Sequence, residues 1–107
     1  DIGIEYCRKH RLNLLLKGSI SVLIEANGNC TFYDYGSSAL AKGGSGDLLA
    51  GLLCGLLVQD YSIKQAVNLG MALQGKAAQL AEKELGSAHA VLSSDILQQI
   101  GKAYASF

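Results

Sequence analysis

The stretch LAKGGSGDLLAG, residues 40–51, decides the fold class and the chemistry expected of this 107-residue chain. Three of the four residues before Asp47 are glycines, and because glycine has no Cβ, their backbone N–H groups can converge on one point. A leucine-dense helix is predicted to begin at Asp47. The N-terminus of a helix adds unsatisfied N–H donors and about half a positive charge. The stretch therefore predicts an anion hole suited to a phosphoryl group.

Asp47 gives this loop its expected chemistry. The loop is not a Walker A motif, because no Lys-Ser/Thr pair follows its last glycine. The carboxylate of Asp47 can instead accept the proton of a hydroxyl that attacks the phosphoryl group. The positive helix N-terminus stabilises the charged carboxylate, so we expect Asp47 to act by its position more than by its basicity.

A purely structural interpretation of the loop remains open. Glycine-rich turns often precede helices, and an aspartate in the first turn is favourable to the helix dipole whatever the function. Lys42 also has two interpretations, a phosphate contact or a solvated cation. The loop by itself therefore leaves both a phosphate site and a simple turn possible.

The residues before the loop predict a helix followed by short strands. The basic residues at 8–10 suit a helix C-terminus, with Ile2, Tyr6 and Cys7 on one face. The Asn-Gly dipeptide at 27–28 favours a hairpin turn between two strands. The predicted order is a helix to about residue 12, a buried strand at 13–16, a strand at 20–25 and a returning strand at 30–35.

The residues after the loop predict three helices. The first, at 47–58, has leucines around most of its circumference, which predicts burial on most sides. Gly51 and Gly55 would let a neighbouring backbone approach it closely. The second helix is expected at 62–85 from its 3.6-residue period. Ser93 or Ser94 would cap the last helix, whose inward side chains are expected to be Ile96, Leu97 and Ile100.

Three helices beside at most three strands make an incomplete unit. An exposed sheet edge and unpaired helix faces would remain if nothing else packed against them. The layout therefore predicts an α/β fold of which residues 1–107 form the C-terminal part.

Composition narrows the class of protein. A hydrophobic content of 50% with a net charge of zero excludes a disordered tail and argues against a surface that coats nucleic acid. The longest apolar run, residues 48–58, is about half of the ~20 residues that a membrane span needs, and no secretory signal opens the chain. Three cysteines without a CxxC spacing predict buried thiols in a reducing compartment and no metal site. We expect a soluble cytoplasmic protein with no nucleic-acid or membrane partner.

Several motifs together resemble a known family. LLKG at 15–18, the Asn-Gly hairpin, and Gly36 followed by LAKGGSGDLLAG resemble the ribokinase-like superfamily. They are most similar to the C-terminal part of the ADP/ATP-dependent NAD(P)H-hydrate dehydratases of the carbohydrate kinase family. Residues 66–78 and 93–96 are similar to that family's closing motifs, so the likeness spans nearly the whole chain. The resemblance implies a three-layer α/β/α domain, whose missing N-terminal portion would hold most of the parallel sheet and much of the substrate pocket.

The resemblance also implies a reaction and its residues. The enzyme would phosphorylate the hydroxyl of hydrated NADH or NADPH from ADP or ATP, and loss of phosphate would regenerate the cofactor. Asp47 would be the catalytic residue that meets the substrate hydroxyl, and the anion hole would consist of Gly43, Gly44, Ser45 and Gly46. The nucleotide would contact the backbone of Gly46 and a segment made of Lys17, Gly18, Ser19, Ile20 and Ser21. Magnesium (Mg2+) would bridge the phosphates with no ligand identified in this sequence, and a homotetramer is implied.

Three departures from the family pattern stand out. Ser21 replaces a usual threonine and keeps a hydroxyl, Ser37 replaces an asparagine, and Gln74 replaces a frequent histidine. A small-molecule kinase of the same superfamily, acting on a sugar, hydroxymethylpyrimidine or thiazole alcohol, remains an alternative. A non-catalytic nucleotide-binding domain is another. The choice between ADP and ATP, and a fused epimerase domain, stay open, and we expect the 107 residues alone to be inactive.

Overall fold

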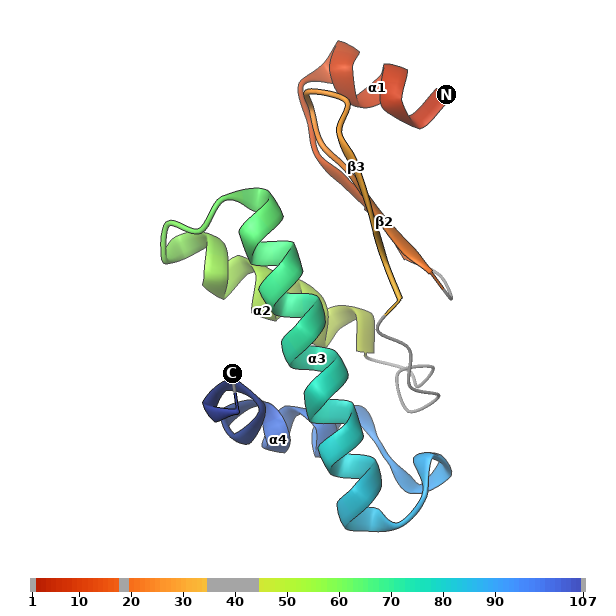
Figure 1. Ribbon diagram of the computed structural model, residues 1–107, viewed down its shortest axis with the longest axis vertical. Coiled ribbons are helices and arrows are strands. Elements are labelled where there is room, and N and C mark those ends of the chain that lie inside the picture. Colours follow the sequence, from red (N-terminus) through yellow and green to blue (C-terminus); the bar gives the residue numbers. More distant parts are fainter. Residues whose placement is uncertain (1, 18–19, 35–44, 107) are drawn as a thin grey trace. The chain divides into compact units, whose positions relative to one another are not determined.

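The computed structural model describes residues 2–17, 20–34 and 45–106. The chain divides into two compact units, residues 1–34 and 35–107, and each is described by itself. The first unit contains α1 (Ile2–His10), β1 (Leu14–Leu16), β2 (Ser21–Ile24) and β3 (Cys30–Tyr33). The second contains α2 (Ser45–Val58), α3 (Ile63–Leu85), the short 3-10 helix η2 (Ala88–Ala90) and α4 (Ser93–Ala105) (Figure 1). The predicted order of helices and strands is confirmed.

The first unit is a three-stranded antiparallel sheet with α1 against it. The strand order is β1-β2-β3, and Leu23 on the central strand is 1% exposed. The register aligns Leu16, Val22 and Phe32 on the opposite face, where Phe32 is 70% exposed. The prediction of a buried first strand is therefore wrong, because β1 lies at an edge of the described sheet and Leu16 is half exposed.

Of the described residues of α1, Cys7 is the one that is buried. Cys7 is fully buried, whereas Ile2 and Tyr6, which were predicted to share a face with it, are exposed. Tyr6 instead packs its ring on His10, with the ring centroids 4.3 Å apart. The face of α1 that carries Cys7 is the one that meets the unit's core.

The Asn-Gly turn between β2 and β3 forms as predicted. Gly28 has a φ of 92°, a left-handed conformation that glycine adopts without the Cβ penalty of other residues. Its N–H donates to the carbonyl oxygen of Glu25 at 2.9 Å, and the Glu25 N–H donates to the Asn29 carbonyl at 2.8 Å. Arg8 lies over the turn, so close that a Cβ on Gly28 would be 2.8 Å from its Cζ. The turn fixes the register of the hairpin.

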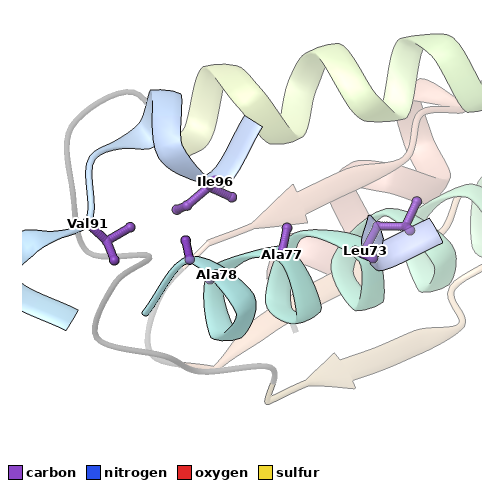
Figure 2. Close-up of a cluster of buried hydrophobic side chains, with 7 residues drawn as sticks. Leu73, Ala77, Ala78, Val91 and Ile96 are labelled. Carbon is purple, nitrogen blue, oxygen red and sulfur yellow. The ribbon is translucent and has the colours of Figure 1, made fainter. Parts of the chain in front are cut away.

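In the second unit, α3 packs against both α2 and α4 (Figure 1). The core between α3 and α4 combines small side chains on α3 with larger ones from the segment that follows it. Figure 2 shows Val91 and Ile96 beside the alanines of α3. The seven members of this cluster are Leu73, Ala77, Ala78, Ala81, Val91, Ile96 and Ala103. The alanines leave room for a close approach, and α3 and α4 make the most extensive helix–helix contact of the described second unit.

The helix α2 is less buried than its leucines predict. Leu49 and Leu56 are buried, but Leu57 is 41% exposed and Val58 is 84% exposed. The close contact of α2 with α3 occurs at Gly70, where a Cβ would lie 2.7 Å from a methyl carbon of Leu53. The prediction of burial on most sides is wrong for the described residues, because α3 and α4 cover only part of the helix.

Helix capping follows the sequence at α3 but not at α4. The Ser62 hydroxyl accepts the N–H of Gln65 at 3.2 Å, and the Gln65 side chain accepts the Ser62 N–H at 3.0 Å, which completes a capping box. At α4, the predicted serine cap is wrong. Asp95 Oδ2 accepts the N–H of Leu92 at 2.8 Å instead, and the helix already begins at Ser93. Of the predicted inward residues, Ile96 is buried, while Leu97 is 59% exposed.

We expect Ser62→Ala to destabilise the second unit by about 1 kcal/mol, because one N–H of the first turn of α3 loses its acceptor. The measurement is urea unfolding followed by helical circular dichroism. Ser94→Ala is the control, since Ser94 is exposed and lies inside α4, where it provides no cap. Equal effects of the two substitutions would contradict the capping role of Ser62.

The sequence predicts buried thiols and no membrane-spanning helix. All three cysteines are free, and Cys7 is buried as predicted, but Cys30 and Cys54 are exposed, so the prediction of buried thiols is wrong for these two. They lie on faces that nothing in the described parts of the chain covers.

Among the described residues, none of the helices combines the length and the apolar character needed to cross a membrane.

Candidate functional site

The N-terminus of α2 contains Asp47, the residue to which the sequence assigns the catalytic role. The helix begins at Ser45, two residues earlier than expected, so Ser45, Gly46 and Asp47 form its first turn. The N–H groups of these three residues have no acceptor within the helix, because the carbonyl four residues back would precede it. Gly46 and Asp47 are both exposed. This end of α2 therefore presents N–H donors that have no acceptor within the helix, beside a carboxylate that is accessible to solvent.

A groove of about 500 Å³ extends along α2 from this carboxylate. The walls of the groove are α2 and α4, and Leu73 of α3 contributes to its floor. Asp47 and Gln59 lie at opposite ends of the α2 wall, and most of the surface between them is aliphatic. The lining residues are Asp47, Leu48, Gly51, Leu52, Gly55, Leu56, Gln59, Leu73, Leu97, Ile100 and Tyr104. The second unit thus combines one carboxylate with an extended apolar depression.

Tyr104, which lines the α4 wall of the groove, interacts with the segment between α2 and α3. Its side chain is hydrogen-bonded to Tyr61, and this bond is the main reason that the pKa of Tyr61 is raised above its ordinary value. This interaction joins the end of α4 to the segment between α2 and α3.

The predicted site residues are divided between the two units. In the first unit, Lys17 and Ile20 are exposed, whereas Ser21 is 4% exposed within β2 and offers little surface to a ligand. In the second unit, Ser45, Gly46 and Asp47 share one helical turn. The other predicted residues lie outside the described residues, and these are Gly18, Ser19, Ser37, Lys42, Gly43 and Gly44. The assignments of nucleotide contacts and of the anion hole therefore stay predictions.

The groove itself is the feature that sequence reasoning did not identify. The sequence contained one signal for it, the spacing of Gly51 and Gly55 on an apolar helix. That spacing indicates that another backbone can approach the helix closely, but it does not indicate which one. Gln74, which stands at the frequent histidine position of the family pattern, is buried in α3.

The described residues do not form a metal site of their own. No group of three or more His, Cys, Asp or Glu side chains within them could hold a metal ion. Magnesium in nucleotide sites is often held by one or two carboxylates together with phosphate oxygens. A cluster of three is therefore not required for magnesium, and the described residues identify no particular ligand of it.

Solved structures establish the class of fold. The chain superposes on the ADP/ATP-dependent NAD(P)H-hydrate dehydratase of Bacillus subtilis, crystallised with ATP and Mg2+, with a TM-score of 0.85 and 30% sequence identity. The match covers 98% of this chain and 38% of the Bacillus chain. The predicted α/β class is confirmed, and the chain contains part of a ribokinase-like fold.

Sequence comparison establishes the family. Residues 3–102 match the carbohydrate kinase family described as NAD(P)H-hydrate dehydratase, and the chain belongs to this family. It is 36% identical over 103 residues to the ADP-dependent (S)-NAD(P)H-hydrate dehydratase of Bacillus subtilis, covering 94% of this chain and 37% of that protein. It is 32% identical over 98 residues to a bifunctional NAD(P)H-hydrate repair enzyme of Dictyoglomus turgidum, covering 92% of this chain and 19% of that protein. The chain thus spans little more than a third of the single-function relative's length.

Proposed function

We propose that residues 1–107 are the C-terminal portion of a dehydratase domain that repairs hydrated NADH and NADPH. The complete domain would consist of this chain and the portion that its relatives carry outside the match. It would transfer a phosphoryl group from ADP or ATP to the hydroxyl of the hydrate, and loss of phosphate would return the reduced cofactor. The family match over residues 3–102 supports the reaction class.

The observation that carries this proposal is the exposed Asp47 in the first turn of α2. The amides of Ser45 and Gly46 have no acceptor within the helix and would donate hydrogen bonds to an anion at the same helix end. A hydroxyl placed between this anion and Asp47 would transfer its proton to the carboxylate as its oxygen attacks phosphorus. The bond from phosphorus to the leaving nucleotide breaks in the same displacement. One helical turn would therefore both stabilise the charge and accept the proton.

The remaining partners follow from the relatives. ADP or ATP would be the phosphoryl donor, with its adenylate side near Lys17 and the residues that follow it. Magnesium would neutralise the phosphates, held by phosphate oxygens together with ligands that the described residues do not identify. We expect the complete domain to work in the cytoplasm, where its nicotinamide substrates are used, and to assemble as a homo-oligomer.

The direct test is an assay of the complete domain on hydrated NADH with magnesium, with ADP and ATP in parallel. We expect absorbance to recover at the reduced-cofactor band with at least one of the two nucleotides, and no recovery with the 107-residue chain alone. A complete domain that ignores hydrated NADH but phosphorylates a sugar, a hydroxymethylpyrimidine or a thiazole alcohol would instead be a kinase. Clear turnover by the 107 residues alone would contradict the proposal that they are only a portion of the domain.

A further inference from the structure

We propose that Gly70 on α3 is a positioning residue for the reaction, because its missing side chain lets α2 cross α3 closely enough to hold Asp47 where the substrate hydroxyl meets it. Gly70 acts through Leu49 and Leu53 of α2 and does not itself touch the substrate. The role of Asp47 comes from the proposed function, on which this inference rests. What it adds is the contact inside the second unit that fixes the place of that carboxylate.

Gly70 lies buried where α2 crosses α3. A Cβ built on Gly70 would lie 2.7 Å from one methyl carbon of Leu53, and 3.7 Å from both the Cγ of Leu53 and a methyl carbon of Leu49. Two carbon atoms pack best at about 3.5–4.0 Å, so a methyl group at position 70 would require Leu53 to retreat by about 1 Å. Two leucines of α2, four residues apart, therefore pack over the bare backbone of α3, as a ridge of one helix fills a groove of another.

Packing is the reason for glycine at position 70. The backbone there is ordinary helix in the interior of α3, and the described glycines with a positive φ are Gly28 and Gly86. Glycine in a helix interior is less favourable than alanine, because it loses more conformational freedom on folding. The close approach of α2 is therefore what glycine at 70 permits.

This contact lies next to the reacting end of α2. Asp47 precedes Leu49 by two residues, which is about 3 Å along the helix axis. Leu49 is 1% exposed, and Leu48 packs against the buried cluster of α3 and α4. The two residues that follow Asp47 are thus both anchored in the core of the second unit. A displacement of α2 at Gly70 is transmitted to the carboxylate, since close-packed interiors transmit strain.

The test is a double-mutant cycle in the complete domain. Gly70→Ala should lower kcat for hydrated NADH at least about tenfold, because a misplacement of about 1 Å can cost a hundredfold in rate. The same substitution in an Asp47→Asn background should change the residual kcat by less than about threefold, since the position of the side chain matters only while it takes the proton. Equal losses in both backgrounds would overturn the proposal and leave Gly70 with a packing role alone.

A second substitution in the same contact separates turnover from stability. Leu53→Ala removes the methyl group that clashes, so Gly70→Ala combined with Leu53→Ala should have a kcat within about threefold of Leu53→Ala alone. Urea unfolding should still show the double variant to be less stable than the parent, because the contacts of Leu53 are lost. A double variant whose kcat stays as low as that of Gly70→Ala would overturn the proposal.

Gly101→Ala is the matched control, because a Cβ on this glycine of α4 meets no described atom within 4 Å. Its kcat should stay within about threefold of the parent's, as expected for a substitution that displaces nothing. A loss in Gly101→Ala as large as that in Gly70→Ala would overturn the proposal, since any added methyl group would then suffice.

A crystal structure of the complete Gly70→Ala domain gives a readout that needs no turnover. With α3 superposed on that of the parent, the Cα of Asp47 should be displaced by about 1 Å. An Asp47 that stays in place would overturn the proposal. A parent domain that ignores hydrated NADH while Gly70→Ala displaces Asp47 would contradict the proposed function alone. A parent domain that turns over hydrated NADH, with Asp47 in place and kcat unchanged in Gly70→Ala, would contradict the positioning role alone.

Discussion

Replacing Asp47 with asparagine is expected to lower the turnover of hydrated NADH by the complete domain by about a thousandfold, while ADP binding stays within about threefold. Asparagine keeps the size and the hydrogen-bonding capacity of the side chain but cannot take the hydroxyl's proton. The helix N-terminus, with the amides of Ser45 and Gly46, is unchanged by the substitution. Steady-state turnover and calorimetric titration with ADP separate the two effects.

Asp60→Asn is the matched control for this prediction. Asp60 is exposed near the other end of α2 and has a φ of 67°, a conformation that asparagine tolerates as well as aspartate does. Its turnover should remain that of the parent. Retained turnover in Asp47→Asn would remove the carboxylate from the reaction and leave a structural turn or a non-catalytic nucleotide site as the role of the loop.

Replacing Ile96 with alanine is expected to destabilise the second unit by about 3 kcal/mol. Ile96 is fully buried between α4 and α3, and its neighbours in the cluster include Ala77 and Ala78, whose short side chains cannot extend into the space left behind (Figure 2). The lost contacts therefore remain a cavity. The measurement is the free energy of unfolding in urea.

Leu97→Ala provides the comparison on the adjacent position of α4. Leu97 is 59% exposed, so its truncation should cost less than about 1 kcal/mol in the 107-residue chain. Similar losses for both substitutions would contradict the assignment of Ile96 to the core and of Leu97 to the open groove.

Much of the local structure follows from short-range signals. The Asn-Gly turn, the serine cap of α3 and the glycine-rich approach to α2 act between residues a few positions apart, so their chemistry can be recognised without the fold. The capping of α4 shows the limit of such signals. Serines stand at its start, but Asp95 takes the capping hydrogen bond with Leu92, because the helix begins one residue earlier than a serine cap at 93 would allow and two earlier than one at 94.

Burial is the property that the sequence by itself predicted least well. The leucines of α2 predict a helix covered on most sides, and only the packing of α3 and α4 shows which of them lie inside. Leu97 and Ile96 are neighbours of similar hydrophobicity, yet one faces the groove and the other the core. Such differences depend on where helices distant in the chain cross, which no local pattern encodes.

The sequence by itself determined the family, the order of helices and strands, and the pairing of a glycine-rich turn with Asp47, because these depend on residue types at fixed short spacings. Only the tertiary structure decided that α2 has, within the described second unit, an exposed apolar face continuous with α4. That face arises where helices distant in the chain cross, so no pattern at short spacing encodes it.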